Sequence, residues 1–354
     1  MARLDAKTIQ EARKAGKLVE HKEAVRYYRF REDFRQIPRG TVLLPKRIIW
    51  GFPHIPRIFR FKEGVERNIA GSFYIEEKID GFNVRIAQID GKIYAFSRGG
   101  FLDLFVTEKA DTPEMKKFFQ AFPGYVLCGE MVGNTPYTPP TKKFDTKLFV
   151  FDMDTGNGDY LSCSEKYWLL EKYGLDSVPV LGKFSGTKNG MRIALSLLKA
   201  KKEGMVIKSA DRKKAVKFVT PYADIEDIGR NMALLFDMPQ GFFLQRVLRS
   251  GIFIKDFQLS HSEYAKRLGN AFYEGLKDGL EQIEQNGQIS EEFEVLINDR
   301  RIWNAIKKHT SREVKLERIF EREEKDGIRI RFRKIYKRTG KKLRDFMAGK
   351  PLVD

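Results

Sequence analysis

Residues 71–100 read GSFYIEEKIDGFNVRIAQIDGKIYAFSRGG, and this stretch decides the fold of the central part of the chain. Runs rich in Val, Ile, Phe and Tyr alternate with glycine-containing turns, which is typical of short strands. Asp90-Gly91, between two such runs, is the signal of a tight hairpin. YVLCGEMVG, KLFVFDMDTG, GMVIKS and AVKFVTP continue the pattern further along the chain. We therefore predict an α+β domain over residues 61–222, built largely on antiparallel sheet.

The flanking segments have a different character. Helical patterns cover residues 4–18, with Asp5 as a candidate N-cap, and recur near 164–174 and 190–202 inside the central domain. Residues 20–60 are basic and aromatic. We expect residues 1–60 to form either a small N-terminal module or an elaboration of the central domain.

The segment 223–299 has the pattern of a helical region. A large apolar residue recurs every four positions along one long helix, with Ser260 or Ser262 as its cap. These residues are Tyr264, Leu268, Phe272, Leu276 and Leu280, followed by Ile283. Packing within the chain would explain such a stripe. The apolar run NMALLFDMPQGFFLQRVLRSGIFI nearby also favours a homodimer through residues 223–299.

Residues 300–354 are predicted to form a basic C-terminal module of mixed α/β type. A helix is expected over 300–309, followed by a hairpin that turns at Asp326-Gly327. Arg329, Arg331 and Arg333 alternate onto one strand face. They would either follow a phosphate backbone or pair with the glutamates of the preceding strand.

Charge is concentrated at the two ends of the chain. The whole chain has a formal charge of +18, of which residues 1–60 contribute +9 and residues 301–354 contribute +10, so the middle is nearly neutral. Basic surfaces attract polyanions because bound phosphates release counterions. We expect a nucleic-acid partner, although a solvated surface rich in ion pairs would show the same balance.

The composition and motifs exclude several classes of protein. A hydrophobic content of 42% is not that of a disordered chain. Two cysteines do not make a disulfide scaffold and fit a reducing, cytoplasmic compartment. No apolar run is long enough for a membrane span, and the N-terminus is not a secretory signal. Four scattered histidines, no GxxxxGK[ST] loop and no GxSxG motif argue against zinc, P-loop and serine esterase chemistry.

One short motif, Lys78-Ile79-Asp80-Gly81, begins a series that is more specific than any of its parts. By itself it would also fit an exposed lysine at the end of a strand. The segments that follow in order are Ser97-Arg98-Gly99-Gly100, Leu127-Cys128-Gly129-Glu130, Phe149-Val150-Phe151-Asp152, Glu203-Gly204-Met205-Val206-Ile207-Lys208 and Ala215-Val216-Lys217-Phe218.

This series resembles the covalent nucleotidyltransferase superfamily of ATP-dependent ligases and mRNA capping enzymes, over about residues 70–220. The resemblance implies an ATP-grasp-like nucleotidyltransferase core in which a lysine amine attacks the α-phosphate of a nucleoside triphosphate and expels pyrophosphate. Such a reaction needs metal ions and cationic side chains for the developing charge more than a strong base. ATP as AMP donor and Mg²⁺ or Mn²⁺ are the cofactors that it implies.

The family's functional residues are carried over position by position. The catalytic set is Lys78 as nucleophile, Lys217 at the α-phosphate and Glu203 at the metal, with Glu130 as a second metal ligand or a ribose contact. The nucleotide-binding set is Glu76, Asp80, Gly81, Asn83, Arg85, Arg98, Glu130, Phe151 and Lys208.

Two points of this assignment are open. The last motif usually has two lysines separated by one residue, but Ala215 stands in the first position, so Lys208, Lys213 or Lys214 would substitute. Phe149 and Phe151 share a face if the strand is regular, and we expect Phe151 to stack on the base.

The helical continuation and EEKIDGFNVR look like archaeal homodimeric ATP-dependent RNA ligases. That resemblance implies joining of 5′-phosphate and 3′-hydroxyl ends of single-stranded RNA, with circularisation as one form of the reaction and single-stranded DNA as another possible substrate. A capping guanylyltransferase, a DNA ligase and an RNA-binding protein with an inactive ligase fold are the alternatives. A DNA ligase should continue into an OB domain, and no such strand series follows.

Overall fold

The computed structural model describes residues 4–138, 145–310 and 314–351. It begins with helix α1 (Ala6–Lys14), whose first turn is capped by Asp5, since its carboxylate accepts a 2.7 Å hydrogen bond from the Thr8 N–H. A four-stranded antiparallel sheet follows, made of β1 (Leu18–Lys22), β2 (Arg26–Phe30), β3 (Val42–Leu44) and β4 (Arg47–Ile49). Its apolar side chains share one core cluster with residues of the next sheet. This sheet therefore packs directly against the central sheet that follows it.

Two four-stranded antiparallel sheets form the central domain, which confirms the predicted α+β class. The first has the order β7–β6–β8–β9, and the second has the order β10–β5–β11–β12. Asp90 (φ 48°) and Gly91 (φ 79°) turn the chain between β6 and β7, as the two positive angles of a type I′ hairpin require. The strand bounds are β5 (Phe73–Lys78), β6 (Phe82–Ile89), β7 (Lys92–Ser97), β8 (Val126–Gly133), β9 (Thr146–Asp154), β10 (Val180–Phe184), β11 (Gly204–Ser209) and β12 (Ala215–Val219).

Helices cover the outer faces of both sheets. α3 (Leu104–Ala110), α4 (Pro113–Ala121) and α5 (Cys163–Tyr173) pack against the first sheet, whereas α2 (Phe61–Asn68) and α6 (Thr187–Lys199) pack against the second. α5 and α6 lie within a few residues of the two predicted helices. The sides of the two sheets that no helix covers face each other, and a cavity lies between them.

The predicted helical region contains α7 (Pro221–Met232), α8 (Phe242–Asp256) and α9 (His261–Asn286), and Ser260 caps the long helix. α7 and α9 touch closely, because a Cβ on Gly275 would lie 2.2 Å from the carbonyl oxygen of Gly229. The predicted stripe of α9 is only half-buried apart from Ile283. On α8, Leu244 is 76% exposed and Leu248 is 57% exposed.

The C-terminal part is a three-stranded sheet of order β13–β15–β14, with two helices. Its elements are β13 (Ser290–Ile297), α10 (Arg300–His309), β14 (Val314–Glu324), β15 (Gly327–Tyr336) and α11 (Lys337–Met347). The predicted helix and hairpin are confirmed, although the hairpin turns at Lys325-Asp326, one residue before the predicted pair, because Glu324 pairs with Gly327. β13 was not foreseen, and it lies inside the segment predicted to be helical.

Glutamates of β13 form ion pairs with the three arginines of β15, Arg329, Arg331 and Arg333. Arg331 and Arg333 pair with Glu292 of β13 at 2.6 and 3.1 Å. Arg329 pairs with Glu294 of β13 at 3.0 Å, with Asp145 at 2.9 Å and with Glu324 of the preceding strand β14 at 3.0 Å, so the predicted pairing with the preceding strand holds for this arginine. These guanidinium groups are largely neutralised within the chain. The expectation that they form a free phosphate-binding face is therefore not met.

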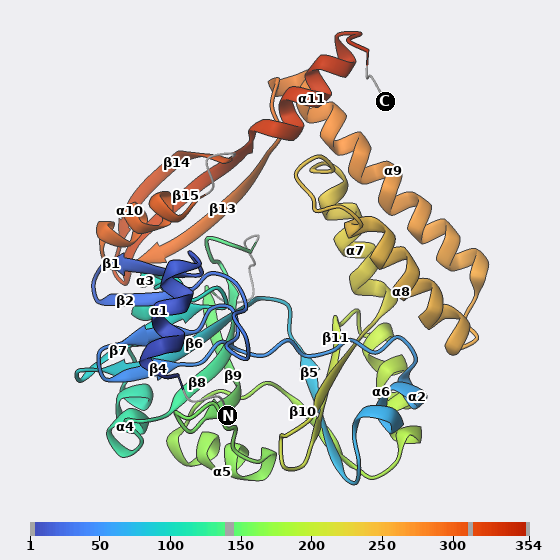
Figure 1. Cartoon of the computed structure of the whole chain (residues 1–354). Helices are drawn as coiled ribbons and strands as arrows, with labels where there is room; N and C mark the ends of the chain where they lie inside the picture. Colours follow the sequence, from blue (N-terminus) through green and yellow to red (C-terminus); the bar gives the residue numbers. More distant parts are fainter. Residues whose placement is uncertain (1–3, 139–144, 311–313, 352–354) are drawn as a thin grey trace.

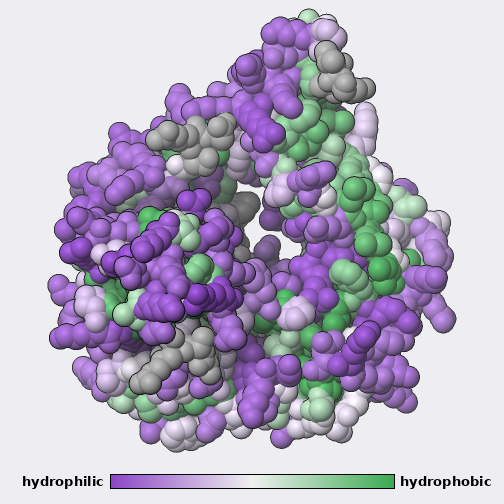
Figure 2. Space-filling model, viewed as in Figure 1, coloured by the Kyte–Doolittle hydropathy of each residue, from purple (hydrophilic) through white to green (hydrophobic). Residues whose placement is uncertain are grey.

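The chain folds back on itself. From the central domain, α7 and α8 lead to α9, and the C-terminal sheet then returns to the first sheet and shares its apolar core (Figure 1). The space-filling view shows an opening between these arms, bordered mostly by hydrophilic residues (Figure 2). Among the described helices, none combines the length and apolarity needed to cross a bilayer.

Candidate active site

A cavity of about 490 Å³ lies between the two central sheets, and it gathers most of the predicted site residues. Its walls come from the ends of β5, β6, β7 and β8, the middle of β9 and β11, and a loop before α2. The predicted residues that line it are Glu76, Lys78, Gly81, Asn83, Arg98, Glu130, Phe151, Lys208 and Lys217.

Lys78 is the last residue of β5, where the strand opens into the Asp80-Gly81 turn. The turn needs glycine because a Cβ on Gly81 would lie 2.4 Å from the Met131 carbonyl oxygen of β8. The Lys78 ammonium is 2.5 Å from a carboxylate oxygen of Glu203, which immediately precedes β11. β5 and β11 are paired neighbours with Lys78 opposite Gly204, so the sheet register itself brings the two side chains together.

Two carboxyl groups near Lys78, those of Glu130 and Glu203, have raised pKa values. Burial raises the pKa of Glu130 to about 7, Lys78 opposes this rise, and the charge of Glu203 adds to it. Burial also raises the pKa of Glu203, against the pull of Lys78. One oxygen of Glu203 and the side-chain oxygen of Asn83 are buried and have no hydrogen-bond partner in the structure.

These oxygen atoms fit a hard divalent cation. Mg²⁺ is commonly held by one or two carboxylates together with substrate phosphates, rather than by an all-protein cage. The described part of the chain contains no cluster of three or more acidic, His or Cys ligands. Glu130 and Glu203 therefore suit a metal that is shared with a bound polyphosphate.

Cationic side chains stand opposite these carboxylates. Lys217 is half-buried on β12, and burial together with Arg57, Lys78 and Arg98 lowers its pKa to about 8. Arg98 is exposed at the rim of the cavity, where its guanidinium lies 3.2 Å from His54. A group of unpaired or repelling cations of this kind favours an anionic ligand.

Phe151 enters the cavity because of a β-bulge. Cys128 pairs with Asp152 and Gly129 with Val150, so Phe151 is the extra residue of β9. Its ring meets the ring of Phe52 edge to face at 5.3 Å. Phe149 does not line the cavity, and its ring lies under the Lys147 ammonium at 5.1 Å.

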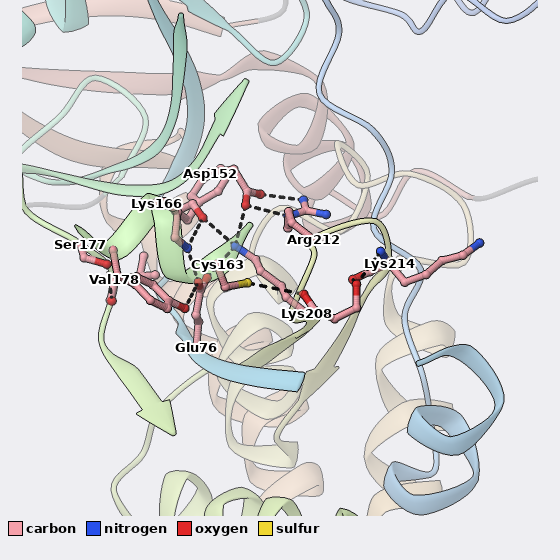
Figure 3. Close-up of polar contacts among 12 residues, drawn as sticks. Glu76, Asp152, Cys163, Lys166, Ser177, Val178, Lys208, Arg212 and Lys214 are labelled. Carbon is pink, nitrogen blue, oxygen red and sulfur yellow. Dashed lines mark hydrogen bonds and ion pairs between the residues drawn. The ribbon is translucent and has the colours of Figure 1, made fainter. Parts of the chain in front are cut away.

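A buried charge cluster joins the two sheets (Figure 3), and two of its members, Glu76 and Lys208, also line the cavity. Glu76 of β5 pairs with Lys208 of β11 at 2.6 Å and with Lys166 of α5. Asp152 of β9 pairs with Lys208 at 3.0 Å and with Arg212 at 2.6 Å. Both lysines also donate to the carbonyl oxygen of the bulged residue Phe151, at 2.7 and 2.6 Å.

This cluster qualifies two of the predicted roles. Glu76 and Lys208 lie at the cavity, but their charged groups are engaged with each other and with the cluster. The pKa of Glu76 is lowered, since Lys208 and Lys166 outweigh the effect of burial. Lys213 and Lys214 are exposed and do not line the cavity, so Lys208 alone of the three candidate substitutes is near it.

The structure does not place three predicted residues in the lining of the cavity. They are Arg85, Asp80 and Glu203, of which Glu203 lines a neighbouring pocket with Asp80 and reaches the cavity only through its ion pair with Lys78. Arg85 is 1% exposed, and its guanidinium donates to the carbonyl oxygens of Trp50, Gly40 and Ser97 at 2.6–2.9 Å. The expectation that it reaches a ribose or a phosphate is therefore not met. Asp80 points to solvent outside the cavity, with Arg230 at 4.0 Å, so only its place in the turn is as expected.

Several cavity residues were not identified from the sequence. They are Phe52, Pro53, Ile55, Tyr137, Val178 and Val206. The aromatic and proline-rich stretch around residue 52 was visible, but nothing in it indicated a return to this site. Lys166 and Arg212 were also missed, because a lysine inside a helix and an arginine inside a polar turn give no signal of burial.

Comparisons with known proteins agree with this geometry. A sequence model described as "RNA ligase" matches residues 71–220, and one described as "Ligase Pab1020 C-terminal region" matches residues 231–350. An uncharacterized protein of Methanocaldococcus jannaschii is 27% identical over 353 residues, covering 93% of this chain and 89% of the relative.

Solved structures match over nearly the whole chain. A protein of Aquifex aeolicus, named provisionally as an ATP-dependent DNA ligase, is 31% identical with a TM-score of 0.92, covering 99% of this chain and 100% of its own. An archaeal ATP-dependent RNA ligase matches in two forms with a TM-score of 0.90 each. Form 1 is 26% identical over 97% of this chain and 96% of its own, and form 2 is 25% identical over 98% and 96%.

Proposed function

Because the chain belongs to the archaeal-type ATP-dependent RNA ligase family, we propose that it joins 5′-phosphate and 3′-hydroxyl RNA ends through an AMP carried on Lys78. The observation that carries the proposal is the Lys78 amine itself. It ends a strand at a cavity of nucleotide size, 2.5 Å from Glu203, and Lys217 lines the same cavity.

In the first step the Lys78 nitrogen attacks the α-phosphorus of ATP. A nitrogen–phosphorus bond forms as the bond to the bridging oxygen breaks, pyrophosphate leaves with the electron pair, and the amine loses a proton. Lys217 and Arg98 supply positive charge for the phosphate oxygens, because both face the cavity. Phe151 and Phe52 offer aromatic surface for the base.

The next two steps move the AMP and seal the RNA. An oxygen of the RNA 5′-phosphate attacks the AMP phosphorus, the bond to Lys78 breaks, and the lysine nitrogen regains a proton. The RNA 3′-oxygen then attacks the 5′-phosphorus, loses its proton and releases AMP. The same cationic side chains serve each step, since every step displaces a group at a phosphate held in one place.

A divalent cation, Mg²⁺ or Mn²⁺, would be held by Glu130 and Glu203, with Asn83 beside them. When bound, it would neutralise negative charge on the phosphates. Burial raises the pKa values of both carboxyl groups, so their charged forms would be stabilised by a bound cation, which supports a metal site here. Ligation should therefore stop on chelation with EDTA and return with added metal.

We assign residues 223–299 to a homodimer interface as part of this proposal. Leu244 and Leu248 of α8 are largely exposed, and the apolar stripe of α9 is half-buried in the single chain. Large apolar side chains exposed together on two neighbouring helices favour burial against a second copy.

A DNA ligase is the second candidate, and the name of the Aquifex aeolicus relative is the observation that favours it. A capping guanylyltransferase would use GTP. An inactive RNA-binding protein is disfavoured, because Lys78, Glu130 and Lys217 line one cavity and Glu203 forms an ion pair with Lys78.

The test is a joining assay with single-stranded RNA carrying a 5′-phosphate or a 5′-hydroxyl, with ATP or GTP, and with matched DNA strands. We expect joined or circular RNA from the 5′-phosphate strand with ATP alone, and none with Lys78→Arg, which keeps the charge but removes the nucleophile. Joining of DNA only would favour the second candidate. A product from the 5′-hydroxyl strand, or full activity of Lys78→Arg, would contradict the proposal.

A further inference from the structure

Tyr137 is a partly exposed aromatic residue at the mouth of the cavity, and the three-step reaction gives it no role. The residue is 47% exposed, and its hydroxyl end lies near the buried carboxyl group of Asp103. The ring of Phe82 meets it edge to face at 4.8 Å. The ring therefore packs against Phe82, while part of it stays open to a ligand.

The place of Tyr137 in the cavity is distinct from that of Phe151. Phe151 lies beside the buried charge cluster, next to the Cys128 end of the β8 pairing. Tyr137 follows the far end of β8, beyond Glu130, on the side where β6 begins with Phe82 and Asn83. The cavity thus has two aromatic walls, with Lys78 and Glu130 along the strands between them.

A lysine of the C-terminal sheet stands over this second wall. The ammonium of Lys334 on β15 is 5.7 Å from the centre of the Tyr137 ring and 4.1 Å from that of Phe293. Although its backbone pairs with β13 and β14, the Lys334 ammonium makes no hydrogen bond or ion pair with any residue of 4–138, 145–310 or 314–351. Burial lowers its pKa to about 8, against the attraction of Glu291. A half-buried ammonium without a carboxylate partner is a position that an anion would stabilise.

We propose that Tyr137 and Lys334 together bind the terminal nucleotide of the RNA strand being joined, with the ring stacking on its base and the ammonium contacting a backbone phosphate. The inference rests on the proposed function, since it names the contact that guides an RNA end to Lys78. Aromatic stacking tolerates any base, and a lysine contact follows the backbone, so the pair recognises RNA without reading its sequence. It also gives the C-terminal sheet a role at the cavity that its neutralised arginines do not supply.

The experiment measures binding of a fluorescent, short, 5′-phosphorylated single-stranded RNA to the full chain at several salt concentrations. Tyr137→Ala should weaken binding by about 5- to 150-fold, as expected for loss of one base–aromatic stack. Tyr137→Phe keeps the ring and should bind RNA with the affinity of the wild type. Lys334→Met should reduce the slope of log affinity against log salt by about 0.7, the value for one phosphate contact to a single strand.

The matched control is Trp168→Ala. Trp168 is an exposed aromatic on α5 with Lys172 at 4.7 Å over its ring, and it does not line the cavity. RNA affinity equal to wild type is expected for it. Equal affinities of wild type and Tyr137→Ala, or an unchanged salt slope for Lys334→Met, would overturn the proposal that Tyr137 and Lys334 bind the RNA end. AMP labelling of the same wild-type preparation tests the proposed function separately, because binding of RNA does not require the adenylate.

Discussion

Replacing Asp152 by Asn should destabilise the central domain more than any surface change of the same kind. The Asp152 carboxylate is 1% exposed and accepts three hydrogen bonds, from Lys208 at 3.0 Å and from two nitrogens of Arg212 at 2.7 and 2.6 Å. An amide of the same shape cannot neutralise two buried cations, and its NH₂ group would face their donors. Removing one partner of a buried ion pair typically costs about 3–5 kcal/mol.

Thermal unfolding followed by circular dichroism would measure the loss. With about 2–4 °C of Tm per kcal/mol for a domain of this class, the expected decrease is about 6–20 °C. Asp111→Asn is the matched control, because its exposed pair with Lys116 at 3.1 Å should be worth less than about 1 kcal/mol. The double variant Asp152→Asn/Arg212→Met removes the cation that loses its only carboxylate and should recover part of the stability. A Tm for Asp152→Asn within about 2 °C of the Asp111→Asn value would refute the reasoning.

Three further outcomes are expected. The pH profile of kcat/KM for AMP transfer to the enzyme should rise through about 7, as the Glu130 carboxyl ionises, and fall above about 8, as Lys217 loses its proton; a profile flat from about pH 6 to about pH 9 would contradict this. Arg85→Met should lower Tm, because three carbonyl oxygens lose their donor. The protein that still folds should bind ATP normally, as measured by calorimetry. Weak ATP binding at an unchanged Tm would instead support the predicted contact between Arg85 and the nucleotide. Sedimentation of a Leu244→Glu/Leu248→Glu variant should yield monomers where wild type is a dimer, whereas a still-dimeric variant would place the interface elsewhere.

The sequence predicted those features that local pattern controls. The Asp90-Gly91 turn and the β14–β15 hairpin follow from turn chemistry and alternation, and both are present. Most of the predicted site residues line one cavity, because the motifs that carry them lie on or beside neighbouring strands of the two central sheets.

The features that were missed depend on distant partners. β13 was read as part of a helical region, and its strand conformation is fixed by pairing with β15. Phe151 lines the cavity as predicted and Phe149 does not, because the bulge at Phe151 breaks the alternation on which a sequence prediction relies. Arg85 has the residue type of a phosphate ligand, but three backbone carbonyl groups from separate segments surround it.

The most direct test of the account is to locate the AMP. The full chain would be incubated with ATP and Mg²⁺, denatured, digested and examined by mass spectrometry, beside Lys78→Ala. The account predicts one acid-labile AMP adduct, on the peptide that contains Lys78, and no adduct in the variant. An adduct on another residue, or none in folded wild-type protein, would contradict the claim that Lys78 is the nucleophile.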